Sequence, residues 1–151
     1  MKICVVGAGS IGERHLRCFL ATGRASVCFV EPNRGLRDTV AARYPGAASF
    51  ETLSMATDAF DPTVAVIATP APLHVPLASE LVERGAHVLI EKPLAVTGDG
   101  VVELSQAVQS RGVIARVAYV YRAHPALERF LPIPKKVKSW NSCPNSPSSY
   151  V

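Results

Sequence analysis

The 151-residue sequence has few cysteines, and their spacing excludes several kinds of site. Its four cysteines form no Cys-x-x-Cys pair, and we expect no metal ion. Cys4, Cys18 and Cys28 stand in apolar segments. We therefore predict that these three are buried and reduced, as is usual in a cytoplasmic protein.

Long apolar runs and clustered basic residues are also scarce. No apolar run reaches the roughly 18 residues of a membrane span, and the chain begins directly with an expected strand rather than a signal peptide, so we expect no membrane association. The net charge is +4, yet the basic residues form no stripe with interleaved aromatics, so nucleic-acid binding is not expected. The positive excess is compatible with an anionic cofactor.

A glycine-rich stretch follows the first apolar run. Residues 3–6 are apolar and mostly β-branched, and Gly7-Ala8-Gly9-Ser10-Ile11-Gly12 comes next, before a helical pattern. Strand, Gly-x-Gly-x-x-Gly and helix in this order predict a dinucleotide-binding loop. In such a loop the first glycine makes the turn, the second admits the pyrophosphate and the third allows close packing of helix on strand. The helix N-terminus would bind the pyrophosphate.

Strand and helix signals alternate along most of the chain, which predicts an α/β fold with a doubly wound parallel sheet of the Rossmann type. The apolar residues Leu36, Val40 and Ala41 are expected to face the core. Strands are predicted at 2–6, 26–30, 47–50, 63–68, 87–90 and 113–120. Helices are predicted at 10–22, at 52–59, at 74–84, at 99–111, and in a segment that Asn33 caps and that ends near Tyr44.

Glu31 ends the second predicted strand, 19 positions after Gly12. A carboxylate there accepts hydrogen bonds from the adenosine ribose and repels a 2′-phosphate, which favours NAD. Arg34 is able to pair with a 2′-phosphate, so NADP stays open. The alternative is that Glu31 merely begins a turn before Pro32.

Two further segments end predicted strands at the edge where ligands of such sheets bind. Thr69 and Pro70 begin a proline-rich loop that places backbone groups against a flat ligand, and His74 follows at a helix start. His74 would contact cofactor or substrate, or else be a half-exposed capping residue. Glu91-Lys92-Pro93 ends the fifth predicted strand. A lysine beside a carboxylate there can assist removal of a hydroxyl proton. The alternative is that Lys92 is an ordinary surface lysine.

These motifs occur in one order together with Tyr121-Arg122-x-His124-Pro125. Over residues 1–131 the sequence resembles the glucose–fructose oxidoreductase/inositol dehydrogenase/MocA-like family of NAD(P)-dependent oxidoreductases. The resemblance implies that the cofactor is held by the residues Gly7, Gly9, Ser10, Ile11, Gly12, Glu31, Thr69, Pro70 and His74, with Glu91 beside them. It implies that Lys92 contacts substrate and nicotinamide ribose, and that Arg122 and His124 close the site.

Members of that family carry a second domain that holds substrate, and the resemblance ends where that domain would begin. We therefore predict a Rossmann domain at 1–123 and a linker or non-native tail at 124–151. The last 23 residues contain no Asp, Glu or His, so no later proton-transfer group is expected and the chain alone is expected to be inactive. The uncovered sheet face and residues 119–125 favour association into a homo-oligomer.

Two functions follow from these features. The first is a dehydrogenase, or its cofactor-binding half, that passes hydride between nicotinamide and a hydroxyl carbon of a sugar, inositol or related polyol. The second is a dinucleotide-binding module without chemistry, such as a truncated paralogue or a partner subunit. A short-chain dehydrogenase is disfavoured because the sequence has no Tyr-x-x-x-Lys pair.

Overall fold

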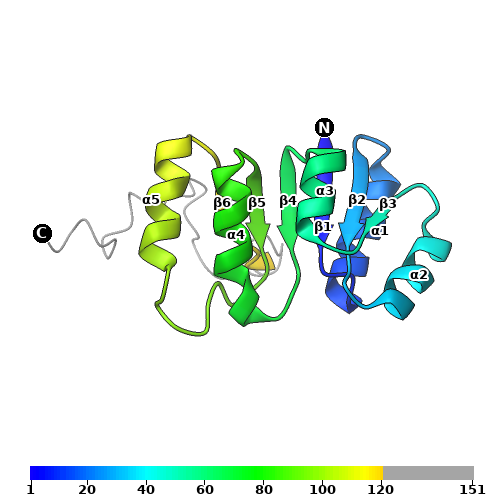
Figure 1. The fold of residues 1–151 in the computed structure, drawn as a ribbon, viewed down its shortest axis with the longest axis horizontal. Helices are drawn as coiled ribbons and strands as arrows, with labels where there is room; N and C mark the ends of the chain where they lie inside the picture. The colour runs from blue at the N-terminus through cyan, green and yellow to red at the C-terminus, as the bar shows by residue number, and fades with distance from the viewer. Residues whose placement is uncertain (121–151) are drawn as a thin grey trace, which may run out of the picture. The chain divides into compact units, whose positions relative to one another are not determined.

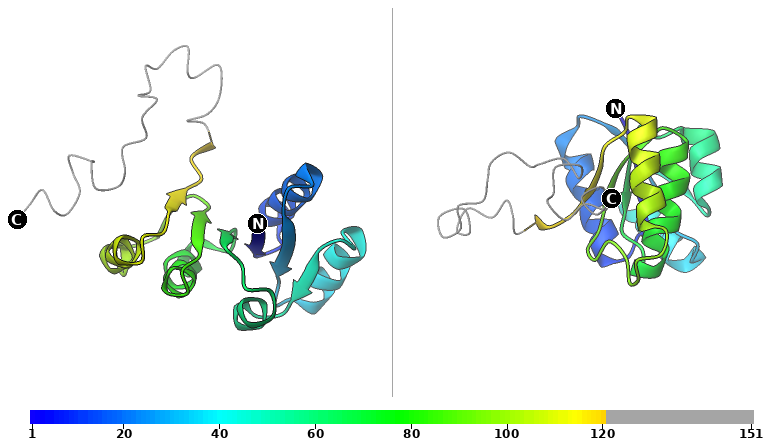
Figure 2. Two further views of the ribbon diagram at one scale, coloured as in Figure 1. Left: turned by 90° about the horizontal axis from the view of Figure 1, so that it is seen from above. Right: turned by 90° about the vertical axis from the view of Figure 1, so that its left-hand side faces the viewer.

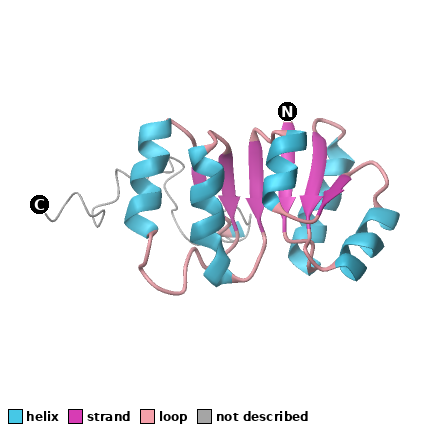
Figure 3. Cartoon of the chain, viewed as in Figure 1, coloured by secondary structure: helices cyan, strands magenta, loops and turns pink. Residues whose placement is uncertain are grey.

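The computed structural model describes residues 1–120, of which residues 1–118 form one compact unit. Six parallel strands make a single sheet in the order β3-β2-β1-β4-β5-β6 (Figures 1 and 3). The sheet is doubly wound, because the chain works outward from β1 to β3 and then returns to β4 beside β1. The α/β Rossmann-type prediction is confirmed.

The strands are β1 (Lys2–Val6), β2 (Ser26–Val30), β3 (Ala48–Phe50), β4 (Val64–Ile67), β5 (His87–Ile90) and β6 (Ala115–Val117). The helices are α1 (Ser10–Thr22), α2 (Arg34–Arg43), α3 (Leu53–Phe60), α4 (His74–Glu83) and α5 (Val101–Arg111), with a short 3₁₀ helix η1 (Ala71–Leu73) before α4. All predicted elements within residues 1–120 exist. The strand predicted at 113–120 is shorter than expected, and α5 begins two residues later than predicted.

Alternate strand residues divide the core into two layers. Cys4, Ala65 and Val88 belong to the layer under α3, α4 and α5, whereas Val5 and Val66 belong to the layer under α1 and α2. Figure 2, left, shows these helices on the two faces of the sheet. The central strands β1, β2 and β4 carry buried apolar residues on both faces, as expected for a buried parallel sheet.

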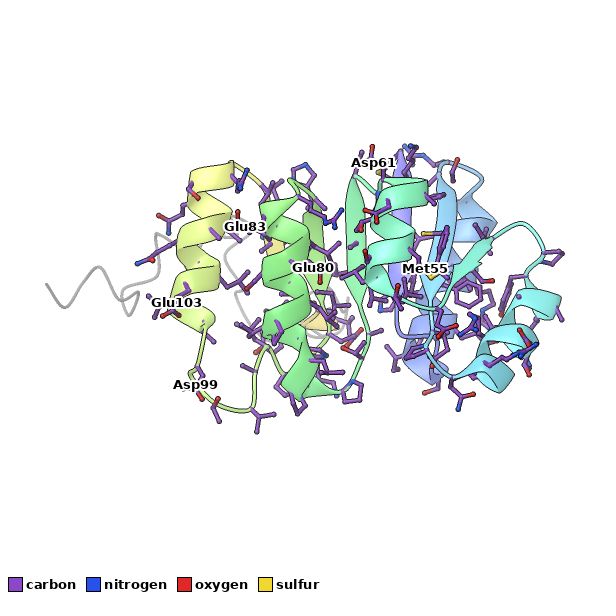
Figure 4. All side chains as sticks on the ribbon, in the orientation of Figure 1. Met55, Asp61, Glu80, Glu83, Asp99 and Glu103 are labelled. Atoms are coloured by element: carbon purple, nitrogen blue, oxygen red, sulfur yellow. The ribbon has the colours of Figure 1, made fainter. Side chains whose placement is uncertain are left out.

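Local sequence signals explain most helix ends. Gly23 and Gly112 end α1 and α5 in the left-handed conformation, with φ of 62° and 65°. Asn33 caps α2 by accepting a hydrogen bond from the Leu36 backbone N–H at 3.0 Å. Glu83 on α4, labelled in Figure 4, pairs with Arg111 on α5 and joins these neighbouring helices.

Two burial predictions need correction. Cys4 and Cys28 are buried side by side on β1 and β2, but Cys18 is exposed because it lies on the outer face of α1. A hydrogen bond with the Cys28 thiol and burial raise the pKa of Cys4. Leu36 was expected to face the core and is instead 37% exposed, because it lies in the first turn of α2. The buried residue of this helix is Val40.

No helix in the described residues is long and apolar enough to cross a membrane. The predicted boundary at 123/124 falls outside the described part of the chain and stays a prediction. The same holds for the predicted roles of Arg122 and His124.

Candidate cofactor site

The predicted site segments meet at the carboxyl edge of the sheet, the lower edge in Figure 1. In each segment, the residue just past a strand donates its backbone N–H to a neighbouring strand. Gly7 bonds to the Val30 carbonyl oxygen at 2.9 Å, and Ala68 bonds to that of Val6 at 2.8 Å. Glu91 bonds to the Ile67 carbonyl oxygen at 2.9 Å. The sheet itself therefore fixes the spacing of the glycine loop, the Thr69 loop and the Lys92 segment.

The three glycines of the loop have three different environments. Gly7 has a φ of +90°, and a Cβ there would lie 2.9 Å from the Ala68 carbonyl oxygen. A Cβ on Gly12 would lie 1.8 Å from the Gly7 carbonyl oxygen, so α1 packs directly on the loop. A Cβ on Gly9 would meet nothing within 4 Å. Gly9 therefore leaves open space beside the start of α1, as an approaching pyrophosphate requires.

The N-terminus of α1 is suited to bind an anion. Gly9 is the N-cap residue, and no side chain caps the helix. The first-turn N–H groups therefore remain available, and Ser10 and Ile11 are exposed. Glu13 adds a negative charge in this turn, but Arg43 and Tyr44 bind its carboxylate. These hydrogen bonds lower the pKa of Glu13, and the Arg43 charge offsets its repulsion of a phosphate.

Glu31 is buried and holds two backbone groups. Its Oε2 accepts the Ala8 N–H and its Oε1 accepts the Asn33 N–H, each at 3.0 Å. The carboxylate is thus tied to the glycine loop beside the place where an adenosine ribose would lie. Glu31 does begin the turn before Pro32, but it also bonds to Ala8, 23 residues away, so the turn alone does not account for it.

Two arginines follow Glu31 and differ in exposure. Arg34 has a side chain that is 87% exposed and pairs with Asp38 at 3.7 Å. Arg37 is largely buried, and its Nη1 donates to the Glu31 carbonyl oxygen at 2.6 Å while its Nη2 contacts Glu51 at 3.2 Å. Sequence reasoning missed this support of the turn, because it depends on a contact between α2 and the residue after β3.

The Thr69 loop lies directly beside the glycine loop. The Thr69 Cγ2 atom would be 3.1 Å from a Cβ on Gly7, whereas its Oγ1 is buried and has no hydrogen-bond partner within residues 1–120. A buried hydroxyl without a partner is costly unless a ligand or water completes it. This orphaned hydroxyl and the space at Gly9 fit a dinucleotide at the edge. Pro70 is exposed on the same loop.

His74 differs from the half-exposed capping residue considered from the sequence. Its side chain is 1% exposed, and it begins α4 without capping that helix. Its Nδ1 lies 2.8 Å from the Pro93 carbonyl oxygen and its Nε2 lies 2.8 Å from that of Thr69. Both ring nitrogens thus face backbone carbonyl oxygens rather than the open edge of the sheet.

Lys92 is exposed at the end of β5, and the Lys92–Pro93 peptide bond is cis. Glu91 beside it is partly buried; its Oε1 lies 2.8 Å from the Nε2 of His15, on α1. No role was assigned to His15 from the sequence. The available signal was its position one turn past the loop, close to the strand ends. Asp99, labelled in Figure 4, lies in the loop between β5 and α5.

Comparisons with known proteins show the family of the chain. Residues 1–119 match the model of the Gfo/Idh/MocA family, described as an oxidoreductase family with an NAD-binding Rossmann fold. Levoglucosan dehydrogenase of Pseudarthrobacter phenanthrenivorans is 27% identical over 99% of this chain and 44% of its own length. Inositol 2-dehydrogenase of Corynebacterium glutamicum is 30% identical over 83% of this chain and 38% of its own length.

A solved structure is similar in fold as well. The WlbA dehydrogenase of Bordetella pertussis, in complex with NADH and UDP-GlcNAcA, is 28% identical, with a TM-score of 0.78. The match covers 85% of this chain and 39% of that one. The chain therefore spans about two fifths of the length of these relatives.

Proposed function

The chain belongs to the Gfo/Idh/MocA family of oxidoreductases with an NAD-binding Rossmann fold, and we propose that it is the cofactor-binding part of a dehydrogenase acting on a sugar, inositol or related polyol. The observation that carries the proposal is the carboxyl edge itself. Glu31, Gly9 and Thr69 follow the neighbouring strands β2, β1 and β4, and this order supports a dinucleotide whose adenosine ribose, pyrophosphate and nicotinamide lie along the edge in turn. The relatives named above are dehydrogenases of such substrates, which supports the substrate class.

In this proposal the nicotinamide supplies hydride transfer, and the residues of the chain orient it. The glycine loop and the start of α1 hold the pyrophosphate, and Glu31 holds the adenosine ribose. Thr69 and Pro70 flank the nicotinamide side. Lys92 contacts substrate and the nicotinamide ribose, where its ammonium hydrogen-bonds the hydroxyl that loses its proton. His74 does not contact the cofactor directly in this proposal, because its side chain is 1% exposed and both of its ring nitrogens face backbone carbonyl oxygens.

Glu31 is expected to favour NAD over NADP. Replacing Glu31 with Ser removes the charge that repels a 2′-phosphate and leaves the exposed Arg34 to pair with it, so preference should move toward NADP. Titration of each variant with NADH and NADPH measures the ratio of the two dissociation constants. Glu31→Gln is a second variant of nearly the same shape as Glu31; it removes the negative charge but keeps a side-chain oxygen that accepts a backbone N–H.

Glu51→Ser is the matched control, because Glu51 is a nearby carboxylate that binds Arg37 on the same turn. This control should leave the NADH to NADPH ratio unchanged. A wild-type chain that binds NADPH more tightly than NADH would overturn the assignment of Glu31.

Turnover by the 151-residue chain alone is expected to be negligible. Lys92 is exposed in the described residues, so water surrounds the ammonium and weakens its interaction with a substrate hydroxyl. A panel of sugars and inositols with NAD, followed by NADH absorbance for wild type and Lys92→Met, tests this. Lys92-dependent turnover would show that the 151 residues catalyse the reaction by themselves. Cofactor binding without turnover would favour the second function, a dinucleotide-binding module that is not catalytic.

A further inference from the structure

The Lys92 backbone is held through Glu91 from one side of the sheet. The Oε1 atom of Glu91 lies 2.8 Å from the Nε2 of His15, and its Oε2 accepts the Lys92 backbone N–H at 3.2 Å. His15 is on α1 and 76 residues away in sequence. The pair is only partly exposed, with side-chain values of 21% and 16%, so solvent weakens it less than a surface pair. One carboxylate thus joins α1 to the residue proposed to reach the substrate.

The same tripeptide is held from the opposite face through Pro93. The Nδ1 atom of His74, on α4, lies 2.8 Å from the Pro93 carbonyl oxygen, and its Nε2 lies 2.8 Å from that of Thr69. A carbonyl oxygen only accepts hydrogen bonds and a neutral imidazole carries a single N–H, so His74 donates to one of these two carbonyls; with the proton on Nδ1 it donates to Pro93. His74 is 1% exposed and has little freedom to leave this position. It therefore joins the end of β4 to the segment that follows β5.

We propose that His15 and His74 are positioning residues that fix the Glu91–Lys92–Pro93 segment from the two helix layers. The Lys92 side chain is exposed, so its direction depends on the backbone that carries it. Fixing that backbone before the cofactor arrives reduces the ordering cost that binding would otherwise incur. This inference rests on the proposed function, in which Lys92 contacts the nicotinamide ribose.

The test compares the affinities of NADH and ADP, because ADP lacks the nicotinamide half of the cofactor. His74→Asn keeps a donor near the Nδ1 position and therefore the Pro93 contact. His74→Gln keeps a donor near Nε2 and loses that contact. In the same way, His15→Gln keeps the donor to Glu91, whereas His15→Leu removes it. The retained and lost contacts thus differ within each pair while the size of the side chain changes little.

We expect His74→Gln and His15→Leu to weaken NADH binding about tenfold and to change ADP binding less than about twofold. His74→Asn and His15→Gln should stay close to wild type for both ligands. Lys92→Met should give the same selective loss for NADH, and adding His74→Gln to it should cause no further loss. His87→Asn is the control, because His87 begins β5 at the opposite end and its Nδ1 only accepts the Ile114 N–H.

The outcomes distinguish the proposed role of Lys92 from the positioning role of the two histidines. If Lys92→Met leaves the NADH to ADP ratio unchanged, the proposed role of Lys92 fails and the positioning role falls with it. If Lys92→Met lowers NADH affinity but His74→Gln behaves like His74→Asn, the positioning role alone is overturned. A parallel loss of NADH and ADP affinity in the histidine variants also overturns it, because a general structural defect would affect both ligands. Should His15→Leu not fold, the two His74 variants decide.

Discussion

Gly9→Val is expected to reduce NADH affinity by at least about a hundredfold while the chain folds normally. The valine side chain would occupy the open space where the pyrophosphate must approach the backbone, and about 2.7 kcal/mol corresponds to that loss. Folding should be unaffected because nothing lies within 4 Å of a Cβ at this position. The Gly9 φ of −62° also suits an L-residue. Isothermal titration gives the affinity, and circular dichroism the melting temperature.

Gly46→Val is the matched control. Gly46 is likewise free of neighbours within 4 Å and has no positive φ, but it lies in the turn between α2 and β3. It should bind NADH as wild type does. Wild-type affinity in Gly9→Val would mean that the pyrophosphate does not pass this glycine, and the assignment of the loop would be wrong.

Gly12→Ala is expected to destabilise the fold by about 3 kcal/mol or more. Alanine normally stabilises a helix interior relative to glycine by about 1 kcal/mol, so helix propensity alone predicts the opposite sign. Here the new Cβ would lie 1.8 Å from the Gly7 carbonyl oxygen, which is backbone in a loop that the sheet holds in place. The helix α1 would have to move away from β1. Urea unfolding of wild type and variant measures the difference.

Gly46→Ala provides the reference for the same chemical change without a close neighbour, and should alter stability by no more than about 0.5 kcal/mol. Equal unfolding midpoints for Gly12→Ala and wild type would contradict the close packing of α1 on the loop.

The sequence predicted the fold well because strand and helix signals were local. The predicted cap of α2 by Asn33 is confirmed, and Gly23 and Gly112 end α1 and α5 through the left-handed conformation that glycine adopts readily. The strand predicted at 113–120 is too long at both ends, because the sequence stays apolar beyond the residues that pair with β5. The ladder between β5 and β6 ends at Ile90 and Val117. The late start of α5 follows from Gly100, whose φ of 71° is left-handed.

The candidate site also contains residues that the sequence predicted and residues that it did not. The glycine loop, Glu31 and the Lys92 segment were predictable because each follows a recognisable strand, and parallel strands bring their carboxyl ends together. Their roles in binding stay predictions. The partners of His15 and His74 were not predictable, since they depend on contacts across 76, 19 and 5 residues that only the packing of α1 and α4 creates.

The central claim is that the described residues bind a nicotinamide dinucleotide by themselves. Isothermal titration of the 151-residue chain with NADH tests it most directly, with NADPH titrated in parallel. We expect saturable one-to-one binding of NADH at or below millimolar concentration, on the order of −4 kcal/mol or more favourable, and weaker binding of NADPH. Absence of binding by both dinucleotides in that range, from a chain whose circular dichroism shows it folded, would contradict the account.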